Sequence, residues 1–500
     1  MLLRHLRAQG FSAAVIDANL GAYLHLLAPE RLAAAAGAQP STALRRALRH
    51  APAALDFLRS PAAAASFARY GTAVGYLNRA LTVWGDDGER LTLGDYHHGS
   101  LSEFIPDDLD RLAAGAARTL FAPYFRDILL PQVAELRPRL LAISVNYRHQ
   151  ILPAFELAGM LRRAFPALPV IGGGGVFSSW RTILRRDGRR FAPFARIVFG
   201  PGETSLAKLA AGQAGDDYYL EDAATVAFDP DFSFAHPADY FSPLPVLPVS
   251  VSRGCYWQQC LFCPEAAAPV HPYACLPPAD FPALLRRLAA ETGVRHFHFT
   301  DDAIPIPVLR RLAEAPAAMA GLGWHGFVRF ETALADPALA AALAAAGCRL
   351  LQLGLESGSQ AVLDRLRKGT RLTAASAILH HLHRAGIATY VYVLLGTPGE
   401  TEAEAEETLR FLEAHAPVIG FLNLAIMNLP RATAEGDLPE EEPLGFYRQS
   451  LPSPGWDRAA VRRFLHGRLL GSPAIRAVVN RTPPVFTSNH AFLFASCRFD

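Results

Sequence analysis

Short apolar runs alternate with helical patterns in the first half of the chain. Apolar strands are predicted at residues 140–147 and 168–175 and at the start of 195–209, and the segment between the first two has its apolar residues at helical spacing. A run at 11–17 predicts a buried strand that opens this part, and a helical stretch follows from about 28 to 90. This alternation predicts a doubly wound parallel sheet.

The second half of the chain has six strand-like runs separated by helical segments. The predicted strands are 247–252, 295–300, 323–330, 349–355, 388–395 and 418–426. The predicted helices are 279–292, 307–318, 336–346, 359–367 with 373–385, and 401–414. Six β/α repeats are two short of a closed eight-stranded barrel, so we expect a partial TIM-like barrel with its active site at the carboxyl ends of the strands.

Segments rich in proline and acidic residues separate these parts. Residues 226–244 read as a linker, and a second acidic, proline-rich segment begins after residue 430. The tail then has helical character and ends in an apolar run at 483–499 that resembles a strand. We therefore predict an α/β domain at 1–225 with a helical insertion, a linker at 226–244, a barrel at 245–430 and a C-terminal extension at 431–500.

The composition narrows the class of protein. The 500 residues are 51% hydrophobic and 19% charged, which is ordinary for a soluble enzyme of two or three domains. A net charge of +2 gives no basic footprint for nucleic acid, and no uncharged apolar run of about 18 residues predicts a membrane span. Six cysteines make no disulfide framework, so we expect a cytoplasmic protein. Cys275, Cys348 and Cys497 are scattered and are predicted to be inert core thiols.

The other cysteines form the motif C-x4-C-x2-C directly after the first predicted barrel strand. They are Cys255, Cys260 and Cys263. Three thiols at this spacing could bind zinc with His271 or Cys275 as the fourth ligand. They could instead bind three irons of a four-iron, four-sulfur cluster and leave the fourth iron open for another ligand.

This region resembles the radical S-adenosylmethionine (SAM) enzymes over about residues 245–430. Their usual motif is C-x3-C-x2-C with an aromatic residue before the last cysteine, and Phe262 keeps that aromatic although the first gap is one residue longer. The resemblance implies a [4Fe-4S] cluster that cleaves SAM reductively to methionine and a 5′-deoxyadenosyl radical. It also implies a reductant such as flavodoxin or ferredoxin.

The same resemblance assigns SAM-binding roles to residues at the strand ends. Carboxylates after the second strand would hold the SAM amino group, because an ammonium and a carboxylate form a strong charge-assisted hydrogen bond. An arginine on the third strand would pair with the SAM carboxylate. The fourth strand end would contact the ribose and methionine parts, and a glycine and glutamate after the fifth would contact adenine. The candidates are Phe262, Asp301, Asp302, Arg329, Glu356, Ser357, Gly396 and Glu400.

Structural roles compete with several of these assignments. Asp301 and Asp302 could each cap a helix. Arg329 could form an ion pair with a barrel acid such as Glu356, and Glu400 could be only an early helix residue. We read Lys368, in the turn after the fourth strand, as a solvated side chain.

The first domain resembles, less specifically, the Rossmann-like cobalamin-binding domains that precede the barrel in one branch of these enzymes. The resemblance places the nucleotide tail of cobalamin along strand ends that carry Ser144, Gly172, Gly173, Gly174, Gly200, Gly202 and Glu203. The D-x-H-x-x-G motif that supplies a histidine to cobalt is absent, so cobalamin would bind without a protein histidine on cobalt. Asn146 and Tyr147 are candidates to face its lower side.

With both halves, the resemblance implies a cobalamin-dependent radical SAM enzyme that methylates an unactivated carbon. The alternatives are a rearrangement, cyclisation or oxidation with or without cobalamin, and, from another class, a zinc-stabilised binding protein. A small molecule or a peptide is the expected substrate, and we expect no nucleic acid and no membrane partner.

Overall fold

The computed structural model forms two compact units. It describes residues 1–85, 88–213, 219–221, 228–263, 265, 273–431, 442–450 and 453–495. Unit 1 consists of Met1–Arg59, Ala68–Phe241 and Glu435–Phe446, and unit 2 consists of Ser60–Phe67, Ser242–Ala434 and Tyr447–Asp500. Each unit therefore draws on segments that lie far apart in the sequence.

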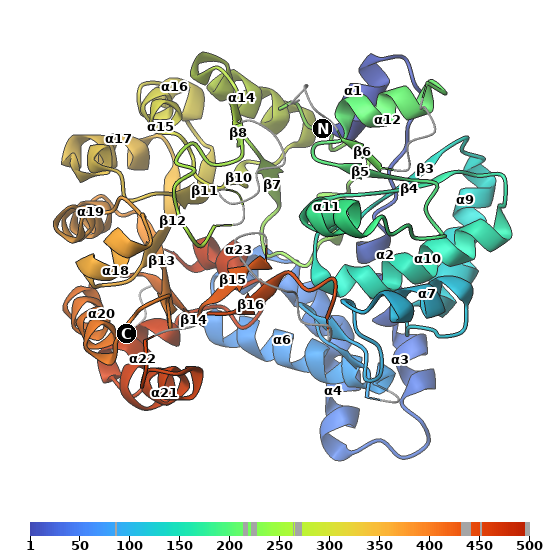
Figure 1. Ribbon diagram of the computed structural model, residues 1–500, viewed down its shortest axis with the longest axis horizontal. Helices are drawn as coiled ribbons and strands as arrows, with labels where there is room; N and C mark the ends of the chain where they lie inside the picture. The colour runs from blue at the N-terminus through green and yellow to red at the C-terminus, as the bar shows by residue number, and fades with distance from the viewer. Residues whose placement is uncertain are drawn as a thin grey trace. The chain divides into compact units, whose positions relative to one another are not determined.

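Unit 1 is built around a four-stranded parallel sheet (Figure 1). Its strands are β3 (Leu141–Ser144), β4 (Val170–Gly173), β5 (Arg196–Phe199) and β6 (Tyr219–Glu221), and they lie in the order in which they occur in the chain. The connecting helices are α10 (Ile151–Ala164), α11 (Gly175–Asp187) and α12 (Glu203–Ala210). This arrangement confirms the predicted α/β class and the strands predicted near 140, 168 and 195.

The N-terminal part of unit 1 is helical, with one small hairpin. The helices are α1 (Leu2–Ala8), α2 (Ala18–Leu26), α3 (Pro29–Ala35), α4 (Thr42–Leu58), α6 (Phe67–Leu81), α7 (Pro106–Ala114), α8 (Ala122–Tyr124) and α9 (Leu130–Leu136), and β1 (Arg90–Leu91) pairs with β2 (Tyr96–His97). The strand predicted at 11–17 is wrong. Val15 and Ile16 are exposed, and the run ends at Asp17, whose side chain accepts from the backbone N–H of Leu20 and caps α2.

Unit 2 contains the predicted six-stranded parallel sheet. Its order is β7 (Val246–Val249), β10 (His296–Phe299), β11 (Gly323–Val328), β12 (Cys348–Glu356), β13 (Ala388–Leu395) and β14 (Phe421–Ile426). Each strand is paired with its neighbour in the chain order of the β/α repeats, so all six carboxyl ends lie at one edge. The six strand predictions are confirmed.

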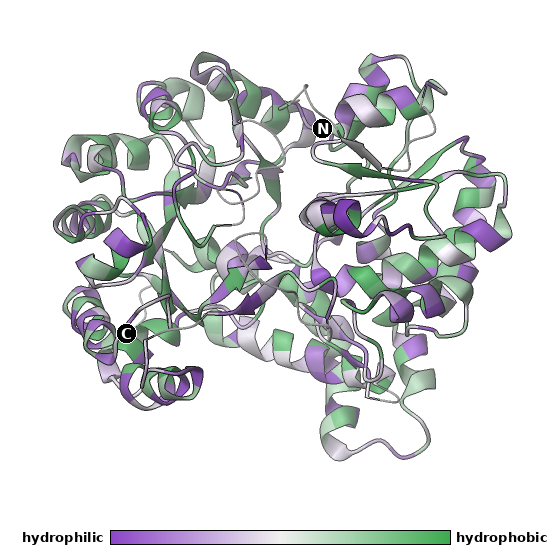
Figure 2. Cartoon of the chain, in the orientation of Figure 1, coloured by the Kyte–Doolittle hydropathy of each residue, from purple (hydrophilic) through white to green (hydrophobic). Residues whose placement is uncertain are grey.

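Helices lie along the outer side of this sheet (Figure 1). They are α14 (Phe281–Thr292), α15 (Ile306–Ala313), α16 (Pro316–Met319), α17 (Pro337–Ala345), α18 (Gln360–Arg365), α19 (Leu372–Arg384) and α20 (Glu402–His415). Figure 2 shows both hydrophobic and hydrophilic residues along α14 and α20, as expected of helices that bury one face. The short helix α5 (Pro61–Ala64) also belongs to unit 2.

The extension of unit 2 is mainly helical. It contains α21 (Arg458–Arg463), α22 (Pro473–Val479) and α23 (Thr487–Ala491), while β15 (Asn428–Pro430) pairs with β16 (Tyr447–Gln449). The strand predicted at 483–499 is wrong as far as residue 495, because the apolar residues of α23 and of the following turn, Phe492–Phe494, are buried as helical turns. Residues 496–500, including Cys497, lie outside the described part.

Histidine side chains from two neighbouring strands pack together on one face of the unit 2 sheet. His298 and His325 face each other on β10 and β11 with ring centroids 4.4 Å apart, and Phe492 stacks on the other face of His325 at 4.4 Å. His325 is 1% exposed, and His490 from α23 is also buried. We refer to His298, His325, His490 and Phe492 as the histidine stack.

None of the helices in the described ranges combines the length and the apolar character that a membrane span requires.

Candidate functional site

The three clustered cysteines lie on a loop that follows β7 at the carboxyl edge of the unit 2 sheet. The loop begins with β8 (Ser252–Arg253), which pairs antiparallel with β9 (Ala274–Cys275). Cys260 is buried, and Cys255 and Cys263 are partly exposed. The backbone N–H of Cys263 donates to the carbonyl of Cys260 at 3.2 Å, so the last two cysteines share one tight turn.

The longer first gap of the motif contains a left-handed residue. Gln258 has φ +50 and is exposed, as is Gln259. This conformation reverses the chain locally, and residues other than Gly, Asn and Asp rarely adopt it. The loop therefore reaches Cys260 through a left-handed turn.

Arg329, which follows β11, lies beside Cys260. Its Nη1 is 3.8 Å from the Sγ of Cys260, and its Nε donates to Oε1 of Glu331 at 3.1 Å. The guanidinium lies over the ring of Trp257, with Cζ 4.3 Å from the ring centroid. Sequence reasoning considered Glu356 as its ion-pair partner, but the acid that pairs with Arg329 is Glu331.

Lys368 is buried, so the expectation of a solvated side chain is wrong. Its Nζ donates to Oε1 of Glu356 at 2.7 Å, and both side chains are 9% exposed. The same Nζ lies 5.5 Å from the ring centroid of Phe262. Arg367 and Gly369 on either side have φ +51 and +72, and this turn directs the lysine inward. A Cβ on Gly369 would lie 2.3 Å from the ring of Trp257, so the turn packs tightly against the cysteine loop.

The chemistry of these donors fits an iron–sulfur cluster. Burial raises the pKa of the Cys260 thiol, and the positive charges of Lys368 and Arg329 oppose that effect. Thiolates bound to iron are anionic, and the two buried cations beside them, each also paired with a glutamate, offset part of the charge of a cluster. Phe262 packs against the apolar cluster of Val362, Leu366 and Met427 and limits the access of water.

The alternative zinc site lacks a complete ligand set in the described part of the chain. Cys275, on β9, is exposed, and His271 lies outside the described residues. Within the described ranges, no three His, Cys, Asp or Glu side chains, the three cysteines included, gather closely enough to hold one metal ion.

Asp301, at the end of β10, holds the start of the cysteine loop. Its Oδ1 accepts from the backbone N–H groups of Val251 and Ser252 and from the Ser252 hydroxyl, at 3.0, 2.5 and 2.6 Å. Burial raises the pKa of Asp301 to about 6, and these hydrogen bonds oppose the effect. Asp302 is exposed, so of the two predicted SAM-binding aspartates only Asp302 faces solvent.

Substitution of Asp301 by asparagine is expected to loosen this loop. The amide nitrogen would face N–H donors, which leaves buried groups unsatisfied and costs about 1–3 kcal/mol of folding free energy. The variant should retain clearly less iron than the wild type after anaerobic reconstitution and desalting. Asp302→Asn is the matched control, and equal iron retention in both variants would contradict the anchoring role of Asp301.

Ser357 and Glu356 leave β12 in different directions. Glu356 has φ +66 and faces Lys368, whereas the Ser357 hydroxyl is fully buried 2.9 Å from Thr408 Oγ1 on α20. A Cβ on Gly358 would lie 2.7 Å from the Cα of Thr408, so strand end and helix approach closely here. The hydroxyl of Ser357 thus joins β12 to α20.

Glu400 folds back onto Gly396 at the end of β13. Its Oε2 accepts from the backbone N–H groups of Gly396 and Thr397 and from Nε1 of Trp456 at 3.4 Å. Glu400 is fully buried, and burial raises its pKa to about 7. It precedes Thr401, the residue that caps α20, so it closes the turn rather than opening the helix. Its predicted role at adenine, like those of the other SAM residues, stays a prediction.

In unit 1, the carboxyl ends of β3 and β4 form an open, polar edge. Ser144, Asn146 and Tyr147 are exposed there, and Asn146 links the two strand ends by donating to Ser144 Oγ at 3.1 Å and accepting from Gly175 N–H at 3.0 Å. Gly174 has φ +99, and a Cβ there would lie 2.6 Å from the carbonyl of Val145. Gly174 therefore lets the two strand ends approach each other closely, and the exposed polar side chains lie at the carboxyl edge, where parallel α/β sheets bind ligands.

The other predicted cobalamin residues have more internal surroundings. A Cβ on Gly172 would contact Phe177 at 3.1 Å, so this glycine serves packing, whereas Gly173 has more space. Gly200 and Gly202 have φ +85 and +86, as the turn into α12 needs, and Glu203 is buried in the first turn of that helix. Their ligand roles remain predictions.

Sequence reasoning missed an aromatic pair at the same edge. The rings of Tyr147 and His149 are stacked with centroids 5.6 Å apart, and His149 Nδ1 lies 3.7 Å from Asp95. A helical turn at Arg148–Gln150 brings these rings together, and the sequence signal was only the spacing of two residues.

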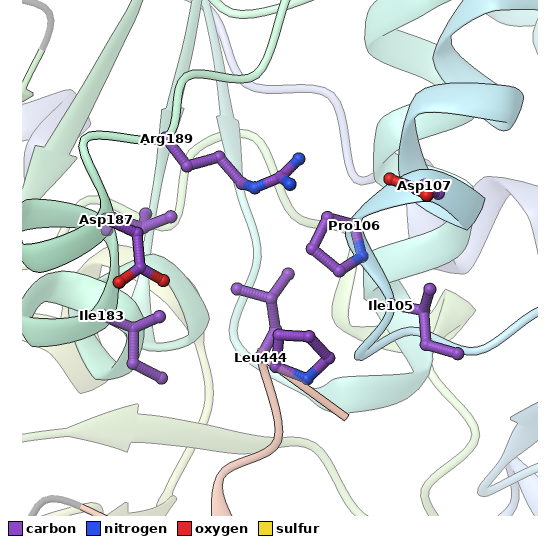
Figure 3. Close-up of a pocket in the computed structure, with 9 residues that line it drawn as sticks. Ile105, Pro106, Asp107, Ile183, Asp187, Arg189 and Leu444 are labelled. Carbon is purple, nitrogen blue, oxygen red and sulfur yellow. The ribbon is translucent and has the colours of Figure 1, made fainter. Parts of the chain in front are cut away.

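A cavity of about 460 Å³ lies elsewhere in unit 1 (Figure 3). Apolar residues from the start of α7 and the end of α11 line it together with Leu444, and Arg189 reaches across it in the close-up. Arg189 lies 3.6 Å from Asp110. The C-terminal end of α11 is remote from the glycines at its N-terminal end, so this cavity is separate from the polar edge.

Comparison with known proteins gives a family for the barrel segment. Residues 249–412 match the model of the Radical SAM superfamily. The chain is 30% identical over 277 residues to a tRNA-2-methylthio-N(6)-dimethylallyladenosine synthase of Halorhodospira halophila. This alignment covers 49% of this chain and 53% of that protein. The chain is 29% identical over 203 residues to a bacteriochlorophyllide d C-12(1)-methyltransferase of Chlorobaculum tepidum, which covers 38% and 42%. The chain spans about half the length of these relatives.

Two solved structures share the fold. The radical SAM methyltransferase TsrM from Kitasatospora setae, with tryptophan and a SAM analogue bound, aligns with a TM-score of 0.53 and 19% identity over 74% of this chain and 87% of that one. The cobalamin-dependent radical enzyme OxsB with aqua-cobalamin and SAM bound aligns with a TM-score of 0.51 and 15% identity over 65% and 57%. Residues 249–412 are therefore a radical SAM domain, and the chain has the α/β fold of cobalamin-dependent radical SAM enzymes.

Proposed function

We propose that the protein is a cobalamin-dependent radical SAM enzyme that methylates an unactivated carbon of a small molecule or peptide. One observation carries this proposal: a three-cysteine loop flanked by buried cations lies at the carboxyl edge of a six-stranded barrel, in a chain whose first unit has an exposed polar strand edge. The fold shared with OxsB and TsrM supports the proposal.

In this proposal, the barrel residues prepare the site for a cluster and SAM. Cys255, Cys260 and Cys263 would bind the cluster, and Asp301 holds the loop that carries them. Asp302, which is exposed at the same strand end, would bind the SAM ammonium group. When bound, the cluster and SAM supply a one-electron cleavage, and cobalamin supplies a methyl group.

Unit 1 would hold cobalamin through its polar strand edge. Ser144 and Asn146 offer a hydroxyl and an amide, and the backbone at Gly173 leaves space for a ligand to approach. The described residues here include no D-x-H-x-x-G histidine, so the exposed Tyr147 and Asn146 would face the lower side of the corrin ring.

A second candidate function is methylthio transfer to RNA. The match to the tRNA-modifying relative favours it. The net charge of +2 argues against it, because recognition of an RNA phosphate backbone requires a concentration of basic residues. The methyltransferase relative and the fold of TsrM support the first candidate.

Anaerobic reconstitution with iron, sulfide and hydroxocobalamin tests the proposal. After desalting, about four irons per chain are expected for one [4Fe-4S] cluster, together with retained cobalt. With SAM and dithionite, the enzyme should release 5′-deoxyadenosine. A variant with all three loop cysteines replaced by alanine is the control. Iron without cobalt would remove the methylation proposal, and zinc without iron would remove the radical mechanism.

A further inference from the structure

One exposed surface of unit 2 combines the cysteine loop with a charged turn. Its exposed residues are Gln258, Gln259 and Leu261 of the loop and Arg367, Gly369 and Arg371 of the turn, which we call together the loop–turn surface. We propose that this surface docks a small acidic one-electron carrier protein that reduces the cluster. The inference rests on the proposed function, because it assumes that the three cysteines hold an iron–sulfur cluster.

Backbone hydrogen bonds fix the two segments against each other. The N–H of Leu261 donates to the carbonyl of Leu366 at 3.1 Å, and Nε1 of Trp257 donates to the carbonyl of Arg367 at 3.0 Å. Arg329 donates to the carbonyl of Lys368 from the inner side. The surface is therefore presented on a rigid support, which lowers the entropic cost of binding a partner.

The charges of the turn divide between its inner and outer sides. Lys368 points inward to Glu356, whereas Arg367 and Arg371 are exposed. Neither of these two arginines has an ion-pair partner within the described ranges. Arg365 is neutralised by a bidentate pair with Glu404 at 2.7 and 2.8 Å. Two unpaired guanidinium groups therefore remain for an acidic partner.

Nearby acidic charge does not cancel this positive pair. Asp364 is the exposed acid of the same segment, and its Oδ1 accepts from Gln360 Nε2 at 2.9 Å. When the paired Arg365 is set aside, segment 364–371 presents two positively charged arginines and one negatively charged aspartate to the outside.

Leu261 supplies an exposed apolar side chain on the loop side of this surface. Its side chain is 49% exposed, although the residue lies between two cluster cysteines, where burial would be expected. An apolar centre with a charged rim is the usual composition of a transient protein interface. The exposed Gln258 and Gln259 extend the polar rim on the loop side.

The position of the surface suits electron delivery. Leu261 follows directly on Cys260, whose Sγ lies 3.8 Å from Arg329, and Arg329 in turn stacks on Trp257. The step is the transfer of one electron from the reduced carrier to the oxidised cluster. The carrier is oxidised, the cluster is reduced, and no atom or proton moves between the proteins.

The experiment uses the reconstituted holoenzyme and reduced flavodoxin as the probe. Two readouts are the Kd for flavodoxin as a function of salt and the stopped-flow rate at which flavodoxin reduces the cluster. The variant Arg367→Glu/Arg371→Glu is expected to weaken binding and slow reduction by about tenfold or more at low salt, with a smaller salt dependence. Leu261→Ala should weaken binding with little change in salt dependence.

The matched control is Arg295→Glu/Arg349→Glu, which makes the same charge change at the amino ends of β10 and β12. It should leave both readouts unchanged. Equal losses in the two charge variants, or no loss in either, would overturn the docking assignment. Dithionite reduces the cluster without docking, so every variant should release 5′-deoxyadenosine normally when dithionite is the reductant. This result separates the docking inference from the proposed function. If the proposed function were wrong, the wild type too would release no 5′-deoxyadenosine with dithionite.

Discussion

Replacement of Lys368 by methionine is expected to lower the free energy of unfolding of unit 2 by about 3–5 kcal/mol. The lysine Nζ and Glu356 Oε1 are 2.7 Å apart and both side chains are 9% exposed, so the substitution leaves a buried carboxylate without its counterion. A Cβ on Gly354 would lie within 2.9 Å of both groups, which shows how little space remains for water to replace the lysine. Denaturant unfolding followed by tryptophan fluorescence measures the effect.

Two comparisons make this test specific to the buried pair. The double variant Glu356→Gln/Lys368→Met should recover most of the loss, because it removes both charges. Glu404→Gln, which breaks a pair with Arg365 that is more exposed than the Lys368–Glu356 pair, should cost about 0–1 kcal/mol. A loss of similar size in Lys368→Met and Glu404→Gln would show that the burial of the lysine has no energetic consequence.

The histidine stack is expected to make unit 2 less stable below pH 6.5. Burial lowers the pKa values of His298 and His490 from 6.5 to about 4 and lowers that of His325 as well. Between pH 6.5 and 4 the unfolded chain therefore binds more protons than the folded chain, so stability falls as the pH falls. Each pKa unit corresponds to about 1.4 kcal/mol, so His298 and His490 each contribute up to about 3 kcal/mol.

The histidine contribution has to be separated from buried acids that act in the opposite direction. Burial raises the pKa of Asp301 to about 6 and that of Glu400 to about 7, so these groups favour the folded state as the pH falls. The measurement is therefore the difference in unfolding free energy between the wild type and His298→Gln/His490→Asn at pH 7.5, 6, 5 and 4. This difference should shift in favour of the variant as the pH falls. His466→Asn, at an exposed position, is the control.

The barrel strands could be predicted from sequence because parallel strands covered on both faces read as nearly continuous apolar runs. The runs at 349–355 and 388–395 fall within β12 and β13, and both strands are mostly buried. The same logic failed at 11–17 and 483–499. Apolar composition indicates burial without fixing the backbone conformation, and in the tail burial is achieved by helical turns that place Phe492 on His325.

The positions of the site residues could be predicted from the sequence, but their hydrogen-bond and ion-pair partners could not. The motif located the cysteine loop and the strand-end acids, because parallel strands bring their carboxyl ends to one edge. It could not show that Asp301 accepts from the loop backbone, because a contact between a strand end and a distant loop depends on the tertiary fold. It also could not show that Lys368 points inward, because that depends on a turn with positive φ at Arg367 and Gly369. Propensity alone gives arginine no preference for such a conformation.

Each unit also depends on a segment made long after the rest of it. In unit 1, Nε1 of Trp180 donates to the carbonyl of Leu444 at 2.7 Å, and in unit 2 the aromatic face of His325 is covered by Phe492. Neither unit can complete its packing on the ribosome before these residues emerge from the exit tunnel. During synthesis the barrel strands, of which the last ends at Ile426, would lack the cover of Phe492 until that residue emerges, so contact with a chaperone is expected over that interval.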